Sequence, residues 1–119
     1  MNIAAQILIA VVALLHLYFL ALEMFFWDQP LGRKVFNLTP EFAAASKKLA
    51  ANQGLYNGFL AAGLIWSLIL GGREGFHVAI FFLACVIVAG IYGALTVNKR
   101  IFFFQALPAL VALAVLHIR

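Results

Sequence analysis

The sequence predicts an all-α integral membrane protein, a four-helix bundle with an up-down-up-down course and a long loop between helices one and two. The 119-residue chain is 66% hydrophobic and 10% charged, with a mean hydropathy of +1.08. A soluble domain is about 45–50% apolar and about 25% charged. Four stretches also lack Asp, Glu, Lys and Arg: 2–22, 49–72, 75–98 and 101–118. Each is about as long as the roughly 20 residues that cross a bilayer core.

The four stretches predict spans over 3–27, 49–71, 76–97 and 101–118, within a single domain covering 1–119. Strands of a membrane barrel would be shorter and would alternate apolar with polar residues, which these stretches do not. No Lys or Arg precedes the first apolar run, and the run is long for a signal peptide. We therefore expect it to remain as helix one.

The loop before the second span contains a helix start. Thr39 is a candidate N-cap, Pro40 stands at the first helical position and Glu41 lies in the first turn. Helix two is therefore expected to begin near Pro40, outside the hydrocarbon, and to enter the membrane near Leu49.

Small residues and one proline predict how the spans pack. Pro108 is expected to kink the fourth span just above Gln105, because a proline removes a backbone hydrogen bond. Small residues four apart let helix backbones approach closely. They predict contact between helices two and three, or between copies of the chain. The residues are Gly54, Gly58 and Ala62 on helix two, and Ala89 with Gly93 and Gly90 with Ala94 on helix three.

Basic residues predict the orientation in the bacterial inner membrane. Loops one and three hold six of them, Arg33, Lys34, Lys47, Lys48, Lys99 and Arg100, whereas Arg73 and Arg119 lie on the other side. The positive-inside rule places these loops in the cytoplasm and both termini outside. A partner nucleic acid is excluded, because these cations lie at span ends, where they set topology and contact lipid head groups.

With this orientation, all four spans carry polar side chains in the cytoplasmic half. This concentration of polar side chains in one half of the membrane predicts a polar pocket that opens to the cytoplasm and ends near His16. The candidate catalytic residues are Glu23 and His16, seven residues apart on one side of helix one. The candidate ligand-binding residues are Asn52, Gln53, Tyr56, Asn57, Tyr92 and Gln105.

Glu23 is the central residue of this prediction. An ionised carboxylate at membrane depth costs several kcal/mol unless it is paired or hydrated. Such a group can serve as a general acid or base, or carry a proton. Two structural alternatives stay open: Glu23 can reach the interface or pair with Arg33 or Lys34, and the amides can simply join helices. No metal-ligand spacing is present, the cofactor is unknown, and the lone Cys85 is read as a small buried hydrophobe.

Several segments resemble a bacterial family of small four-span proteins, catalogued as a domain of unknown function, number thirteen-hundred-and-four. They are "HLYFLALEMFFW" (16–27), "LAANQGLYNGFLAAGLIWSL" (49–68), "CVIVAGIYGALT" (85–96) and "QALPALVAL" (105–113). The resemblance covers nearly the whole chain. The resemblance implies that the chain is a membrane protein, and it does not imply any established activity.

A more distant similarity is to the membrane-associated eicosanoid and glutathione metabolism proteins. "KKLAANQGLYNGFLA" (47–61) is similar to their second-helix motif, with Lys47, Asn52 and Asn57 at comparable places. Residues 55–57 replace its acidic stretch, and helix three lacks the arginine that activates the thiol. The similarity implies a shared trimeric architecture rather than shared glutathione chemistry.

Three functions remain open at this level. The first is a membrane enzyme or binding protein for a small amphipathic or anionic molecule taken from the cytoplasmic leaflet. The second is a proton-linked transporter or accessory subunit that uses Glu23 and His16. The third is an assembly subunit whose polar face docks a membrane partner. A homo-oligomer, dimer or trimer, is expected, and whether the chain is an enzyme stays open.

Overall fold

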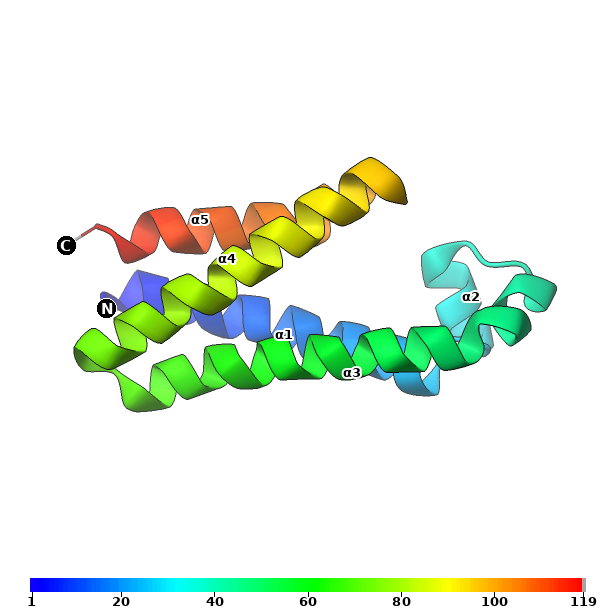
Figure 1. The fold of residues 1–119 in the computed structure, drawn as a ribbon, viewed down its shortest axis with the longest axis horizontal. Coiled ribbons are helices and arrows are strands. Elements are labelled where there is room, and N and C mark those ends of the chain that lie inside the picture. Colours follow the sequence, from blue (N-terminus) through cyan, green and yellow to red (C-terminus); the bar gives the residue numbers. More distant parts are fainter. Residues whose placement is uncertain (119) are drawn as a thin grey trace. The chain divides into compact units, whose positions relative to one another are not determined.

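The fold is all-α, as the sequence predicts. A computed structural model describes residues 1–118, which contain helices and no strand. In chain order they are α1 (Ile3–Phe25), α2 (Pro30–Phe36), α3 (Pro40–Leu70), α4 (Gly72–Thr96), the π-helical turn η1 (Phe102–Ala106) and α5 (Leu107–Leu116) (Figure 1).

Three helices are long and apolar enough to cross a membrane: α1, α3 and α4, with 23, 31 and 25 residues. Their presence supports a membrane protein. The span predicted over 101–118 corresponds to a shorter apolar stretch, Phe102–Leu116, which comprises η1 and α5. The first three predicted spans, 3–27, 49–71 and 76–97, overlap α1, α3 and α4, and where the membrane begins and ends along these helices stays a prediction.

The chain divides into two compact units. The first unit contains Met1–Leu15 and the chain from Leu60 onward, and the second unit is His16–Phe59. The first unit therefore holds the beginning of α1, the end of α3, and all of α4, η1 and α5. The second unit holds the end of α1, all of α2 and the beginning of α3.

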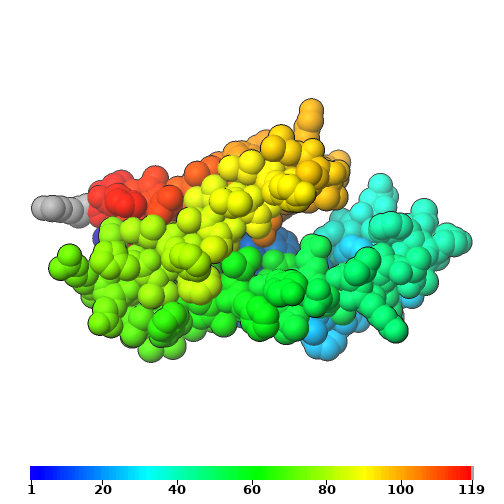
Figure 2. Space-filling model, viewed as in Figure 1, coloured from blue at the N-terminus to red at the C-terminus, as the bar shows by residue number. Residues whose placement is uncertain are grey.

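The core of the first unit is built from small and branched side chains. Its buried residues are Ala5, Ile9, Val12, Ala13, Leu64, Ala79, Leu83, Val86, Ala109, Ala112 and Leu116. In the space-filling view, α4 packs closely along α5 and η1 (Figure 2). Large apolar side chains lie outside, such as Ile3 at 75% and Leu95 at 81% exposure. Large apolar side chains exposed on the outside are the arrangement expected where lipid covers the surface.

The glycines that the sequence predicted to join helices two and three do not do so, but contact other parts of the chain. A Cβ on Gly90 of α4 would lie 2.5 Å from the backbone nitrogen of Ala106 in η1, and one on Gly93 would lie 3.0 Å from Ile101. On α3, Gly54 and Gly58 face side chains of α1. The prediction that these glycines join helices two and three is therefore wrong. Gly54 and Gly58 meet α1, whereas Gly90 and Gly93 meet the chain at and just before η1. The predicted alternative, contact between copies of the chain, stays a prediction.

The disturbance predicted at Pro108 takes the form of a π-helical turn. The Leu107 N–H donates to the Phe102 carbonyl, five residues earlier, rather than to the carbonyl four residues earlier. A proline ring clashes with the carbonyl of the preceding turn in a regular helix. A wider turn directly before Pro108 relieves this clash, and π-turns of one turn are a known cause of helix distortion.

Asn2 ties the two ends of the first unit together. Its Oδ1 accepts a hydrogen bond from the Ala5 N–H at 2.7 Å, as an N-cap does. Its Nδ2 donates to the carbonyls of Val115 at 2.8 Å and Ile118 at 2.6 Å. One side chain therefore satisfies a free donor at the start of α1 and adds a hydrogen bond to one carbonyl in the last turn of α5 and to another just after the helix.

The predicted start of α3 is confirmed. The Thr39 Oγ1 accepts a hydrogen bond from the Phe42 N–H at 3.2 Å, and the helix begins at Pro40. Before it lies α2, which the sequence analysis missed. This short helix starts with Pro30 and ends at Phe36, and the residue after it, Asn37, has a left-handed φ of 55°, a conformation that asparagine tolerates.

Candidate functional site

The Glu23 carboxyl lies at the contact between α1 and α3, within the second unit. Its side chain is 3% exposed. Oε1 accepts a hydrogen bond from Asn57 Nδ2 at 2.5 Å, and Oε2 accepts one from Gln53 Nε2 at 2.6 Å. Each oxygen of this carboxyl therefore has one amide donor from the opposite helix. We call Glu23, Gln53 and Asn57 the carboxyl–amide cluster.

Helix geometry explains why these two amides reach the same carboxyl. Gln53 and Asn57 are four residues apart on α3, so they project from one face on successive turns. Gly54 and Gly58 lie on the side of α3 that meets α1. A Cβ on Gly54 would lie 3.1 Å from Glu23 Cβ and 3.2 Å from the Leu20 carbonyl oxygen. The missing side chain lets the two helices approach until the short asparagine side chain can reach the carboxyl.

The cluster contains a carboxyl and no cation. Arg33, one of the two partners that the sequence suggested, pairs instead with Asp28, with 3.5 Å between Nη1 and Oδ1. Within residues 1–118, Glu23 forms no ion pair with Lys34 or with any other basic residue. The predicted pairing with Arg33 or Lys34 is therefore wrong. Among the described residues, the carboxyl is stabilised by two neutral amide donors and by no opposite charge.

His16 lies on the same helix, seven residues before Glu23, and is fully buried. Its ring meets the Phe19 ring edge to face, with 5.4 Å between the centroids. Seven residues are about 10 Å along a helix, nearly two turns. Among the described residues, no three His, Cys, Asp or Glu side chains are grouped as a metal site would need.

The remaining candidate residues fall into two sets. Asn52 and Tyr56 belong to the second unit and are exposed, Tyr56 at 57%. They precede Gln53 and Asn57 by one residue, and about 100° of helix rotation turns them away from the carboxyl. Tyr92 and Gln105 belong to the first unit, on α4 and η1. That they converge with Glu23 on one pocket stays a prediction.

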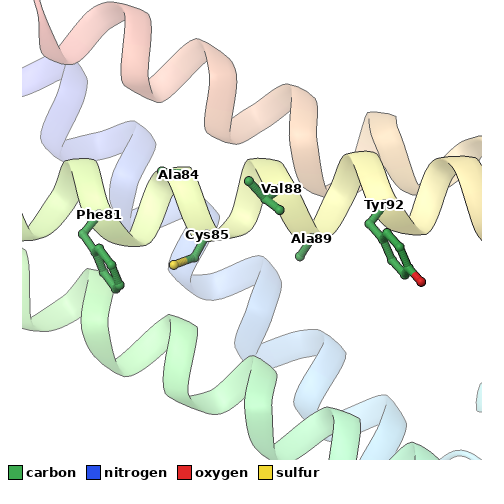
Figure 3. A pocket seen from close by; sticks show the side chains of 6 residues that line it. All are labelled: Phe81, Ala84, Cys85, Val88, Ala89 and Tyr92. Atoms are coloured by element: carbon green, nitrogen blue, oxygen red, sulfur yellow. The ribbon is translucent and has the colours of Figure 1, made fainter.

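Tyr92 lines an open apolar hollow on α4, together with Phe81, Ala84, Cys85, Val88 and Ala89 (Figure 3). Cys85 is a free thiol and partly buried. A second open hollow is lined by Ile91, Ala94, Leu95, Lys99, Phe102 and Phe103. Both are shallow and almost entirely apolar, which suits acyl chains or another apolar helix rather than a polar ligand.

The sequence analysis missed Trp27 as a structural residue. Its indole Nε1 donates to the Ser46 hydroxyl at 3.0 Å, and its ring packs against Phe36 with centroids 4.9 Å apart. These contacts attach the end of α1 to α2 and to the start of α3. By itself, a tryptophan after an apolar span indicates only a residue at the membrane interface. Nothing in the sequence indicated that a serine 19 positions later would accept its N–H.

The fold and this site define a helical membrane protein with a carboxyl–amide cluster inside its second unit. Comparison with known proteins identifies the family to which this membrane protein belongs. Residues 10–117 match the model of a family described as "Protein of unknown function (DUF1304)". The chain belongs to this family, as the resemblance of its motifs implied.

One relative of the chain is the "Uncharacterized protein YpaA" of Lactococcus lactis subsp. lactis (strain IL1403). The two are 34% identical over 115 residues, which cover 95% of this chain and 96% of the relative. No solved structure matches the chain. The similarity in architecture to the eicosanoid and glutathione metabolism proteins therefore stays a prediction.

Proposed function

We propose that the chain is an integral membrane binding protein whose carboxyl–amide cluster binds the head of a small amphipathic molecule. One observation carries this proposal: the Glu23 carboxyl is buried at 3% exposure with amide donors only and no cation in the described residues. A buried carboxyl without a countercharge is costly inside a membrane, and such groups are there mostly for function. A structural contact between helices needs only neutral amides or hydroxyls.

The chemistry of the cluster favours a ligand head that donates hydrogen bonds or carries positive charge. A carboxylate accepts about four hydrogen bonds, and Glu23 receives one at each oxygen. A ligand ammonium or hydroxyl would fill the remaining capacity and supply the missing countercharge. The exposed Gln53 is the amide that a ligand would displace first, because it forms the less buried of the two hydrogen bonds.

We also propose how the chain is arranged in the membrane. The chain is a single domain of four spans with an up-down-up-down course, its fourth span formed by η1 and α5. The loops between the first and second spans and between the third and fourth spans are cytoplasmic, and both termini are outside. Six basic residues on the former side against two on the latter support this orientation.

We predict opposite accessibility for two exposed charged residues, Lys47 and Glu74. In a Cys85→Ala background, Lys47→Cys should resist a membrane-impermeant maleimide in intact cells and react after permeabilisation. Glu74→Cys should react in intact cells. The positive-inside rule is the physical reason. The reverse labelling pattern would place the basic loops outside and refute the proposed topology.

The binding function is tested by native mass spectrometry of the protein released from mild detergent. We expect a non-phospholipid mass on the wild-type chain that is absent from Glu23→Gln. This substitution keeps the size of the side chain and one oxygen that can accept from Asn57. The matched control is Glu41→Gln, which removes an exposed carboxyl at the start of α3 and should retain the mass.

The same spectra report the oligomeric state, for which we propose a dimer or trimer. A protein that carries only phospholipid, or a mass retained equally in Glu23→Gln, would contradict binding at the cluster. That result would favour the second candidate, an assembly subunit. The observation on its side is that both Glu23 oxygens already have donors within the chain.

A further inference from the structure

The second unit carries exposed basic and apolar residues on α2 and at the start of α3, and none of them belongs to the carboxyl–amide cluster. Leu31 and Val35 lie one turn apart on α2, and both are 47% exposed. Lys34 lies between them in sequence and is exposed, as are Lys47 and Lys48 on α3. We call these five residues the α2 surface.

Specific contacts fix α2 in place. Trp27 bridges α1 to both flanking elements through Phe36 and Ser46. Gly32 is buried, and a Cβ there would overlap the carbonyl of Phe26 at the end of α1. An exposed loop with polar tips would not need this anchoring. Instead, α2 exposes the apolar side chains of Leu31 and Val35, which would contact water if nothing else covered them.

The charge of this region is positive and mostly unneutralised. Residues 25–49 contain Arg33, Lys34, Lys47 and Lys48 against Asp28 and Glu41, so the net charge is 4 − 2 = +2. Asp28 is occupied by Arg33. In the described part of the chain, none of the three lysines forms an ion pair. Trp27 contacts Phe36 of α2 and Ser46 of α3, so it joins the helices that carry these lysines, and three unpaired cations with exposed apolar side chains on such joined helices match the head group and acyl chains of an anionic lipid.

We propose that the α2 surface binds anionic phospholipid, with the lipid phosphate at Lys34, Lys47 and Lys48 and with Leu31 and Val35 among the acyl chains. Charge complementarity selects the occupant, because a zwitterionic lipid offers no net charge to the lysines. Seven residues make α2 too short to bind a membrane by itself, and its place at the interface rests on the topology proposed above, in which spans flank it on both sides. This inference is independent of Glu23 and of any ligand there.

The test is a lipid titration of the full chain in detergent, followed by native mass spectrometry with phosphatidylglycerol and phosphatidylcholine of identical acyl chains. Each lysine near an anionic head group contributes about a fivefold change in affinity. We expect phosphatidylglycerol to bind more than tenfold tighter than phosphatidylcholine. The combined substitution Lys34→Gln, Lys47→Gln and Lys48→Gln should reduce this preference to about twofold or less.

Two further variants make the result specific. Arg73→Gln removes an exposed cation at the start of α4 and should keep the full preference. The pair Leu31→Ser and Val35→Ser should weaken both lipids alike while the preference remains. Helix content measured by circular dichroism shows that each variant is folded. Equal binding of the two lipids to the wild type, or an unchanged preference in the triple lysine variant, would overturn the proposal.

Discussion

Replacing Asn57 with leucine is expected to lower the free energy of unfolding by about 2 kcal/mol. Hydrogen bonds between membrane helices average about 0.6 kcal/mol and reach about 1.7 kcal/mol. Asn57 is 8% exposed and donates to a buried carboxyl oxygen, so its loss leaves that oxygen without a donor. An unsatisfied buried acceptor costs about 1–3 kcal/mol, which puts this substitution above the average for membrane hydrogen bonds.

Two further variants test whether the loss of stability comes from the hydrogen bond between Asn57 and Glu23. Gln53→Leu removes the other donor, but Gln53 is exposed, so water or lipid head groups can replace it and the loss should be below about 1 kcal/mol. Glu23→Leu combined with Asn57→Leu removes both polar groups and should recover at least half of the loss. Unfolding by SDS titration in mixed micelles measures these three variants, Glu23→Leu alone and the wild type. Strictly additive single effects would show that Glu23 and Asn57 do not interact.

The cluster shows how far residue types alone predict a site. A carboxyl within an apolar span and a group of polar residues at the start of the next span are visible in the sequence. Four of these, Asn52, Gln53, Tyr56 and Asn57, were predicted to face Glu23. Only Gln53 and Asn57 hydrogen-bond to it. Helix rotation divides the four into two pairs, but which pair faces α1 depends on Gly54 and Gly58, whose contact helix the sequence did not reveal.

In the same way, the parts of the fold with a local sequence signal could be predicted, and the parts that depend on long-range contacts could not. The start of α3 was predicted because its signal is local: a capping threonine, a proline and a glutamate in three consecutive positions. The π-helical turn was predicted only as a disturbance, since Pro108 indicates that a regular helix cannot continue but not which distortion replaces it. The helix α2 was missed because seven residues are too few for a periodic pattern, and its stability comes from Trp27 and Gly32.

Small residues also have different roles that spacing alone cannot separate. Gly54 brings two helices close enough for polar side chains to meet, whereas Gly90 brings α4 against the backbone of η1. Both belong to patterns of small residues four apart. The difference lies in the atom opposite the glycine, and it determines what a methyl group at each position would do.

Replacing Gly90 with alanine is expected to lower the free energy of unfolding by about 2 kcal/mol, because overpacking a tight contact costs about 1–3 kcal/mol. The new Cβ would lie 2.5 Å from the backbone nitrogen of Ala106, 2.8 Å from its Cβ and 2.9 Å from its Cα. Backbone atoms of η1 cannot turn aside, so the two helices would have to separate. Separation would open the first unit beside Pro108, where the π-helical turn has already replaced regular helical hydrogen bonds.

Gly58→Ala is the matched control, since Gly58 also lies in a helix but faces only the flexible end of a side chain. Its Cβ would lie 2.7 Å from Leu20 Cδ1 and 4.0 Å from Leu20 Cγ, and a change of rotamer removes the conflict. Alanine also favours helix over glycine by up to about 1 kcal/mol, so this variant should be neutral or slightly more stable. Thermal unfolding in detergent compares the two directly. Equal melting temperatures would mean that α4 and η1 do not cross at Gly90, whereas a drop confined to Gly90→Ala would identify the backbone of Ala106 as the reason that this position must be glycine.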